Sequence, residues 1–253
     1  MLSAAEKRLY RRHIILPEVG EEGQEKLKAS KILVVGAGGL GAPVLQYLTA
    51  AGVGNITILD DDTVSEDNLQ RQILYGRHDL GKLKTIIAKE RLKTLNPWVN
   101  HEIFNIRLKP ENAFEFLSKF DIIVDASDNF STRYLINDTC VLTQKPFIYG
   151  AIHKFEGQVS TFIYNNGPSL RCLYPNVKDD VNVIKPQNAG TLGVLPGIIG
   201  SFQANEVLKI ILGIGDILCG KLLMYNMLNN SFRTVDFERE EANFKIENLR
   251  KSY

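Results

Sequence analysis

Short hydrophobic runs alternate with amphipathic stretches along the first 150 residues of the chain. The runs at 32–35, 56–59 and 120–126 are typical of strands buried on both faces of a parallel sheet, because such strands have no solvent side. A period close to 3.6 residues predicts helices between them. The predicted helices cover 41–51, 82–95, 110–119 and 133–142, and two further strands are predicted at 101–106 and 147–150. This alternation predicts a doubly wound, Rossmann-like α/β fold.

The second half of the chain has a different pattern. A strand at 157–164 and a hairpin formed by 221–225 and 231–237 predict antiparallel strands added to the mostly parallel sheet. A hydrophobic stretch at 196–212 predicts a buried helix, whereas 175–190 is polar, irregular and longer than an ordinary connection. We expect a single domain over 1–253, which consists of an N-terminal half (1–150), a mixed-sheet half (151–237) and a charged tail (238–253) that is a surface helix or frayed.

Composition gives no support to some classes of function. With a net charge of +1, the chain offers no electrostatic argument for binding nucleic acid or a membrane surface. No apolar segment is long enough to span a bilayer, and the N-terminus lacks the features of a secretory signal. The three cysteines, Cys140, Cys172 and Cys219, cannot form a disulfide framework. A reducing cytoplasm is therefore the expected setting.

The segment 31–62 combines a glycine-rich loop with a strand before it and a helix after it. Gly36 is expected to permit a tight turn, Gly38 to let a phosphate approach backbone N–H groups, and Gly41 to let the helix pack closely on the sheet. The positive end of that helix then faces the anion. Asp60 ends the next strand, where a carboxylate can accept hydrogen bonds from a ribose. The unit predicts nucleotide binding, a property that dehydrogenases share.

Charged side chains after these strands favour a nucleoside triphosphate over a dinucleotide. Arg71 and Lys84 can offset phosphate charge, and Asp128, at the carboxyl end of another strand, can hold a magnesium ion or its water. Hydride transfer needs no such set of charged residues around a triphosphate. The other candidates for the nucleotide site are Asp62, Asn68, Gln72 and Asn129.

Each of these residues also has an ordinary structural interpretation. Arg71 and Lys84 could be solvated surface charges, and Asp128 could cap the helix that follows it. The four histidines form no ligand cluster in the sequence. The polar residues of the C-terminal helix that are spaced for packing rather than catalysis are Gln203, Glu206 and Lys209.

Six motifs occur in order along the chain, and together they resemble one family. They are GAGGLG, the DDD segment, NLQRQ, GKLK, DASDN followed by Arg133, and GSFQANEVLK. The set is similar to the MoeB/ThiF/HesA family of bacterial adenylyltransferases, which are relatives of ubiquitin-activating enzymes, and the resemblance runs from about Leu9 to Phe237. The resemblance implies a homodimer that uses magnesium and ATP to adenylate the C-terminal glycine of a small ubiquitin-like sulfur carrier ending in Gly-Gly, as in molybdopterin or thiamin biosynthesis. It implies nucleotide binding by 1–150 and carrier binding by 151–237.

Residue roles follow from the resemblance position by position. Asp128 matches the metal-linked acid of the family. Arg12 resembles an arginine that one subunit donates to its partner's site, although Arg11 beside it could do the same. The residues implied to bind the ATP phosphates or ribose are Gly39, Gly41, Asp60, Asn68, Arg71 and Lys84.

The sequence departs from the family at its cysteines. Many relatives hold zinc with two C-x-x-C pairs, whereas here Ser169 and Cys172 stand at the first pair and no cysteine follows Cys219. A four-cysteine zinc site is therefore not expected. Where relatives often carry a cysteine that links covalently to the carrier, this chain has Pro186, and Cys140 is expected to be inert in a buried helix. Adenylation without a covalent enzyme–carrier intermediate is the resulting hypothesis.

Other functions are compatible with the sequence. Related enzymes adenylate short peptides or an RNA nucleoside carboxyl group, and the near-neutral charge weakly disfavours RNA. A noncatalytic module would bind the carrier without turning over ATP. An NAD-dependent oxidoreductase would use the glycine-rich loop and Asp60 but gives Arg71, Lys84 and Asp128 no role.

Overall fold

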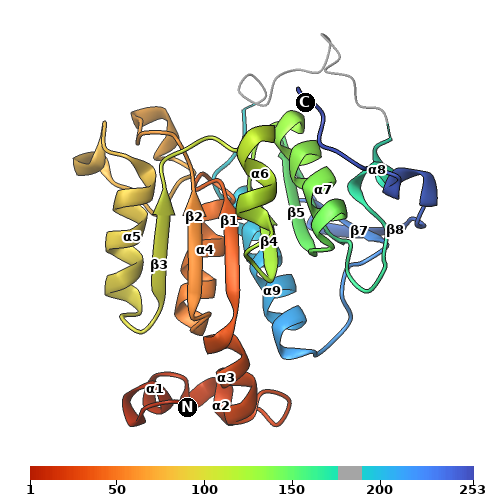
Figure 1. The fold of residues 1–253 in the computed structure, drawn as a ribbon. Helices are drawn as coiled ribbons and strands as arrows, with labels where there is room; N and C mark the ends of the chain where they lie inside the picture. The colour runs from red at the N-terminus through yellow and green to blue at the C-terminus, as the bar shows by residue number, and fades with distance from the viewer. Residues whose placement is uncertain (176–189) are drawn as a thin grey trace.

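The computed structural model describes residues 1–175 and 190–253, in which one sheet is covered by helices on both faces (Figure 1). The strands are β1 (Lys31–Val35), β2 (Asn55–Leu59), β3 (Asn100–Phe104), β4 (Ile122–Asp125), β5 (Phe147–His153), β6 (Glu156–Phe162), β7 (Lys221–Asn226) and β8 (Ser231–Asp236). The α-helices are α1 (Ala4–Leu9), α2 (Arg11–Ile14), α3 (Gly20–Ala29), α4 (Gly41–Ala51), α5 (Lys84–Leu95), α6 (Pro110–Leu117), α7 (Phe130–Thr143), α8 (Leu170–Leu173) and α9 (Val194–Leu212). Short 3-10 turns are η1 (Glu66–Asn68), η2 (Arg77–Asp79) and η4 (Glu241–Phe244).

The strand order in the sheet is β3-β2-β1-β4-β5-β6-β7-β8. The strands from β3 to β5 in this order are parallel, and β6, β7 and β8 are added antiparallel. The predicted Rossmann-like sheet with antiparallel C-terminal strands is thus confirmed. Because the parallel strands share one direction, their carboxyl ends meet at one edge of the sheet.

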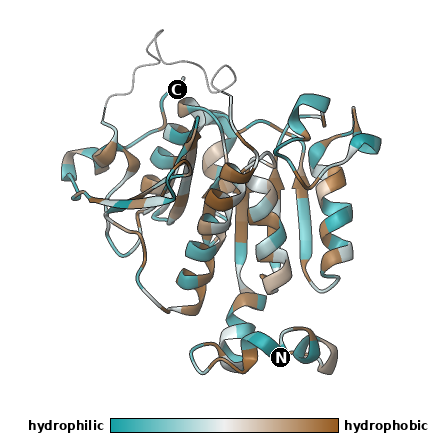
Figure 2. Cartoon of the chain, turned by 180° about the vertical axis from the view of Figure 1, so that it is seen from behind, coloured by the Kyte–Doolittle hydropathy of each residue, from teal (hydrophilic) through white to brown (hydrophobic). Residues whose placement is uncertain are grey.

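The side chains of β1 explain why this strand is hydrophobic without alternation. Ile32 and Val34 belong to the core under α4, α5 and α9, whereas Leu33 and Val35 belong to the core under α6 and α7. Burying both faces removes apolar surface from water on each side of the strand. Figure 2 shows the α4 and α9 side, where much of α9 is coloured as hydrophobic.

Several element boundaries differ by one to three residues from those predicted from the sequence, and α7, β5 and β3 are examples. Helix α7 begins at Phe130 rather than Arg133, because the Asn129 side chain accepts a hydrogen bond from the Thr132 N–H and caps it earlier. Strand β5 continues past Gly150 because its pairing with β6 extends to His153. Strand β3 ends at Phe104, two residues before the predicted end at Ile106.

The charged tail was predicted to be a surface helix or frayed, and the structure shows no α-helix there but a packed segment. It contains the single 3-10 turn η4, and its hydrophobic side chains pack against the core under α6 and α7. Those side chains are Phe244, Ile246, Leu249 and Tyr253. The polar segment predicted at 175–190 and its Pro186 lie almost entirely outside the described residues.

The N-terminal helices α1, α2 and α3 lie at the edge of the sheet where the parallel strands begin (Figure 1). Tyr10 fixes them there, because its hydroxyl accepts a hydrogen bond from Asn96 Nδ2 at 2.7 Å, just after α5 ends. This edge is opposite to the one at which β1 and β4 end. Over 1–175 and 190–253, no helix combines the length and hydrophobicity needed to cross a membrane.

Candidate nucleotide-binding site

A glycine-rich loop joins β1 to α4 at the carboxyl edge of the sheet. Gly36 has a φ of +100°, and a Cβ atom at this position would lie 2.7 Å from the Ala126 carbonyl oxygen. A Cβ atom on Gly41 would lie 2.1 Å from the Gly36 carbonyl oxygen. Only glycine therefore fits at these two positions, as the sequence predicted, and the loop is held directly before the N-terminus of α4.

Asp60 fixes the start of this loop. Its Oδ2 accepts a hydrogen bond from the Ala37 N–H at 2.7 Å, and its Oδ1 accepts one from the Asp62 N–H at 2.9 Å. Burial raises the pKa of Asp60, and the Ala37 N–H and the charge of Lys84 oppose that increase. Each carboxylate oxygen has a further lone pair, so Asp60 can still accept a hydrogen bond from a ribose hydroxyl.

Lys84 is a buried cation at the first residue of α5. Its Nζ lies 2.9 Å from Asp62 Oδ2, and its side chain is only 4% exposed. The interpretation of Lys84 as a solvated surface charge is therefore wrong. A cation at the positive end of a helix is unfavourable, and burial adds to that cost. An additional anion beside Lys84 would offset both.

Arg71 and Gln72 lie against the glycine-rich loop. A Cβ atom added to Gly39 would lie 3.6 Å from Arg71 Cγ. A Cβ atom added to Gly38 would lie 3.5 Å from Gln72 Nε2. Gln72 Nε2 also donates to Asn68 Oδ1 at 2.6 Å, which brings Asn68 to the same place. Gln72 Oε1 is buried without a hydrogen-bond partner among the described residues, and such an atom needs a ligand or a water.

Asp128 follows β4, which is the neighbour of β1 in the sheet. Its side chain is exposed, and its Oδ1 accepts a hydrogen bond from Asn129 Nδ2 at 3.3 Å. Asn129 caps α7, so the interpretation of Asp128 as the helix cap is wrong. The carboxylate of Asp128 is thus available at the edge of the sheet where the glycine-rich loop lies.

Asp125 and Arg133 support the turn that carries Asp128, and sequence reasoning did not assign them to the site. Asp125 Oδ1 accepts hydrogen bonds from the Ser127 N–H at 3.0 Å and the Ser127 hydroxyl at 2.6 Å. Arg133 Nη2 donates to the Ser127 carbonyl oxygen at 3.1 Å. Burial raises the pKa of Asp125, whereas the charge of Arg133 lowers it. The signal in the sequence was the first acid of DASDN, which was interpreted only as part of a strand.

Polar residues of α9 have structural roles, as their spacing predicted. Gln203 Nε2 donates to the Asp125 carbonyl oxygen at 2.7 Å and to the Ile148 carbonyl oxygen at 3.2 Å, and so ties α9 to β4 and β5. Glu206 Oε2 accepts from the Leu218 N–H at 2.8 Å.

Arg12 is not part of this arrangement within one chain. It is exposed on α2, at the opposite edge of the sheet from the glycine-rich loop (Figure 1). Its predicted role therefore requires a second copy of the chain.

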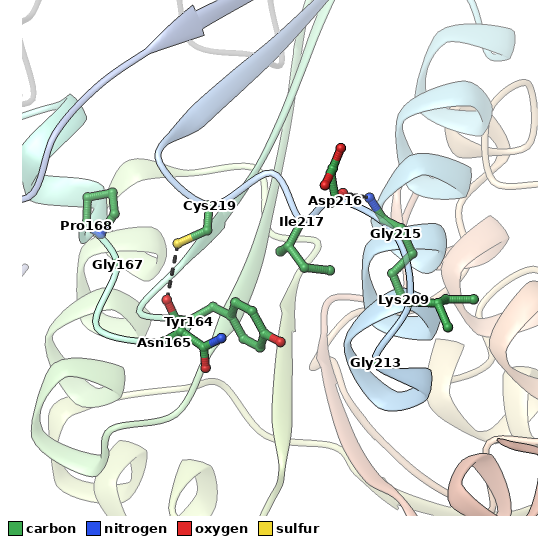
Figure 3. Close-up of a pocket in the computed structure, with 11 residues that line it drawn as sticks. Tyr164, Asn165, Gly167, Pro168, Lys209, Gly213, Gly215, Asp216, Ile217 and Cys219 are labelled. Carbon is green, nitrogen blue, oxygen red and sulfur yellow. Dashed lines mark hydrogen bonds between the residues drawn. The ribbon is translucent and has the colours of Figure 1, made fainter. Parts of the chain in front are cut away.

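A separate pocket of about 480 Å³ lies at the far end of α9 (Figure 3). Pro196, near the start of α9, lies beside Gly39, whereas Lys209 lines the pocket about 20 Å further along the helix. Lys209 is already paired with Glu206 at 2.5 Å. Burial raises the pKa of Cys219, whose Sγ donates to the Tyr164 carbonyl oxygen. A protonated thiol and a paired lysine give this pocket no evident chemistry, so the glycine-rich loop remains the candidate nucleotide site.

Cys140 has the inert position that its sequence context predicted. It is fully buried in α7, and burial raises the pKa of its thiol well above the ordinary value. A thiol that remains protonated is a poor nucleophile.

The fold and the candidate site define an α/β protein with a glycine-rich loop, a buried lysine and an exposed carboxylate at one edge of a mostly parallel sheet. The profile of the ThiF family matches residues 10–245. The chain belongs to the ThiF family, which confirms the resemblance found in the sequence.

Curated relatives carry related names. A protein from Thermus thermophilus named sulfur carrier protein adenylyltransferase is 50% identical over 235 residues, which are 91% of this chain and 87% of that protein. A protein from Porphyra purpurea named probable molybdopterin-synthase adenylyltransferase is 51% identical over 224 residues. The match covers 88% of this chain but only 59% of that longer protein. These names agree with the prediction of an adenylyltransferase.

Solved structures support the fold. The E. coli MccB structure with MccA-N7isoASN has a TM-score of 0.82 at 20% identity, and the match covers 94% of this chain and 73% of MccB. At this identity the similarity supports the architecture alone.

Proposed function

We propose that this chain uses ATP and magnesium to adenylate the C-terminal glycine carboxylate of a small ubiquitin-like sulfur carrier. The observation that carries the proposal is the buried cation of Lys84 beside a glycine-rich loop, with the exposed carboxylate of Asp128 at the same sheet edge. The name of the Thermus thermophilus relative supports the class of substrate.

The reaction needs positioning and charge relief more than it needs a general base, because the nucleophile is already a carboxylate. A carrier carboxylate oxygen forms a bond to the α-phosphorus of ATP, the bond from that phosphorus to the bridging oxygen breaks, and pyrophosphate leaves with the bonding electrons. Arg71 and Lys84 offset the phosphate charge that would otherwise repel the carboxylate. The product is an acyl-adenylate.

Asp128 is the residue that we expect to hold magnesium. A carboxylate oxygen is a preferred ligand of this ion, and Asp128 is exposed and free of the capping role. When bound, magnesium neutralises charge on the phosphates.

The loop, Asp60 and the residues around them are proposed to bind the nucleotide, and the half 151–237 is proposed to bind the carrier. We also propose that the working unit is a homodimer, since Arg12 lies far from the glycine-rich loop of its own chain. The free cysteines Cys140, Cys172 and Cys219 favour a reducing compartment, for which we propose the cytoplasm.

ATP–pyrophosphate exchange tests the proposed reaction. We expect exchange that depends on magnesium and on a candidate carrier ending in Gly-Gly, and none with the same carrier lacking its last glycine. Asp128→Ala should lower the rate at least about 100-fold. The matched control is Glu90→Ala, which removes an exposed carboxylate from α5.

The other outcomes separate the alternatives. Tight carrier binding without exchange would favour a noncatalytic module and overturn the proposal. Exchange driven by a short peptide or by RNA, and not by the carrier, would replace the substrate. Binding of NADH, detected by its fluorescence, without any ATP binding would favour an oxidoreductase.

A further inference from the structure

Four residues hold the tail that follows β8 against the segment that contains α8. We call Ser169, Cys172, Glu240 and Asn243 the tail clasp. Cys172 Sγ lies at its centre and accepts a hydrogen bond from the Glu240 N–H at 3.3 Å. Asn243 Nδ2 lies 3.7 Å from the same sulfur, and Ser169 Oγ lies 3.5 Å from it. Two segments about 70 residues apart in the sequence therefore meet at one thiol.

The spacing within the tail clasp matches that of a zinc site with two C-x-x-C pairs. Ser169 and Cys172 are three residues apart, and so are Glu240 and Asn243. Four thiolates around zinc, at a Zn–S distance of about 2.3 Å, lie about 3.8 Å from one another. The distances from Cys172 Sγ to Asn243 Nδ2 and Ser169 Oγ are close to this value. Ser169 and Asn243 thus place side-chain atoms at about the separation of zinc ligands from the Cys172 sulfur, but the residue types are different.

The residues present do not fit zinc. Structural zinc sites use four cysteine or histidine ligands, whereas the tail clasp offers one thiol, one hydroxyl and one amide. Glu240 contacts Cys172 through its backbone, and its side chain is exposed. Within 1–175 and 190–253, no group of three or more His, Cys, Asp or Glu side chains is arranged to hold a metal. We propose that the tail clasp replaces the four-cysteine zinc site of relatives with direct hydrogen bonds, so that the tail is held without a metal.

Arg239 reinforces the tail clasp on its outer side. Its Nη1 donates to the Asn166 carbonyl oxygen at 3.2 Å and to the Gly167 carbonyl oxygen at 3.3 Å. Its guanidinium also lies 3.4 Å from the centre of the Phe244 ring. The two hydrogen bonds join Arg239, which directly precedes Glu240, to the loop before α8, and the ring contact holds Arg239 against the end of η4.

A second attachment holds the end of the tail to the same part of the fold. The Tyr253 hydroxyl donates to Asp138 Oδ2 at 2.9 Å. Arg171, which lies between Ser169 and Cys172, donates to both carboxylate oxygens of Asp138 at 2.7 and 2.8 Å. The tail is thus fixed at both ends of 240–253 by side-chain contacts.

Metal analysis of the purified chain is the first test. After expression with added zinc, we expect far less than one zinc per chain and a melting temperature that a strong chelator does not change. About one zinc per chain, with a melting temperature that falls on chelation, would overturn the proposal.

Restoring the cysteines tests the positions directly. Ser169→Cys, Glu240→Cys and Asn243→Cys, combined in one variant, should bind about one zinc per chain and make the melting temperature sensitive to chelator. Cobalt in place of zinc should give the visible absorption of a tetrahedral thiolate site. In the matched control, Glu241→Cys replaces Glu240→Cys, which shifts one ligand by a residue and should abolish tight binding. A folded triple variant that binds no more zinc than this control would contradict the proposal.

Hydrogen–deuterium exchange provides a second test of the tail clasp, which does not require the triple variant to fold. Cys172→Ala removes the acceptor of the Glu240 N–H, so exchange in 239–244 should become faster. Cys219→Ala, the matched control, should leave this segment unchanged. Equal protection of 239–244 in Cys172→Ala and wild type would show that the tail clasp does not hold the tail.

Discussion

Lys84 Nζ lies 2.9 Å from Asp62 Oδ2, although the lysine side chain is 4% exposed and the aspartate side chain is 69% exposed. Water solvates Asp62 well, so its attraction for the lysine is weakened. The cation is nevertheless buried at the N-terminus of α5, where the helix dipole disfavours it. This position makes sense for a cation that meets the phosphates of a nucleotide.

Lys84→Met should lower the enzymatic activity without lowering the stability of the fold. It keeps the length of the side chain and removes the charge, so ATP–pyrophosphate exchange should fall about 100-fold or more. The melting temperature should stay the same or rise, because replacing a buried charge with an apolar group is often neutral or stabilising. Lys89→Met is the matched control, since Lys89 is exposed on the same helix. A folded Lys84→Met variant with nearly full exchange would exclude the phosphate role.

Gly41→Ala should destabilise the fold at the glycine-rich loop. The added Cβ atom would lie 2.1 Å from the Gly36 carbonyl oxygen, so α4 must move away from the loop. We expect a loss of about 2 kcal/mol or more in the free energy of unfolding, measured by denaturant titration. Gly197→Ala in α9 is the matched control, because its Cβ atom would meet nothing within 4 Å. That change should be neutral or stabilise by up to about 1 kcal/mol, and equal effects at both sites would contradict the steric argument.

Local sequence patterns predicted much of this fold and the position of several candidate site residues at the carboxyl edge of the sheet. Gly36 and Gly41 were identifiable because a strand, a turn and a helix follow directly in sequence. Asp60 and Asp128 were placed at one edge because parallel strands end together. Their roles toward a nucleotide are predictions that binding and exchange experiments will decide.

Contacts between remote segments were harder to predict. Lysine is rarely buried, so residue type alone favours a surface position for Lys84, and only its place among the motifs indicated the candidate site. The choice between Asp128 and Asn129 as the cap of α7 depends on side-chain direction, which a pattern of residue types does not contain. The packed tail depends on Cys172 meeting Glu240, 68 residues further along the chain.

His101 should make stability depend on pH. Its ring Nε2 lies 2.9 Å from Thr49 Oγ1, and burial, with a smaller effect of Lys89, lowers its pKa from 6.5 to about 4. Between these values the unfolded chain binds a proton that the folded chain does not, so the free energy of unfolding decreases as pH falls. The contribution of His101 to that decrease is at most about 2 kcal/mol from pH 7 to pH 5, because solvent screening reduces it.

His101→Gln removes this titration while keeping a polar side chain. Denaturant titrations at pH 7 and pH 5 should therefore show a smaller loss of stability in the variant than in wild type. His153→Gln, which removes an exposed histidine ring, is the control. Its loss of stability between pH 7 and pH 5 should equal that of wild type. Equal pH dependence in His101→Gln and wild type would show that His101 titrates normally in the fold.

Inactive variants of Arg12 and Asp128 should restore activity to each other when both chains are present in one dimer. Arg12→Ala and Asp128→Ala are each expected to be nearly inactive in ATP–pyrophosphate exchange. In a co-expressed mixture, half of the dimers carry one copy of each, and one of their two sites has both native residues. The mixture should therefore recover about one quarter of wild-type activity. If Arg12 acted within its own chain, no intact site would form and no activity would return. The same test with Arg11→Ala distinguishes the two adjacent arginines. If one of the two single variants keeps its activity without a complementing chain, the partner's site does not need that arginine.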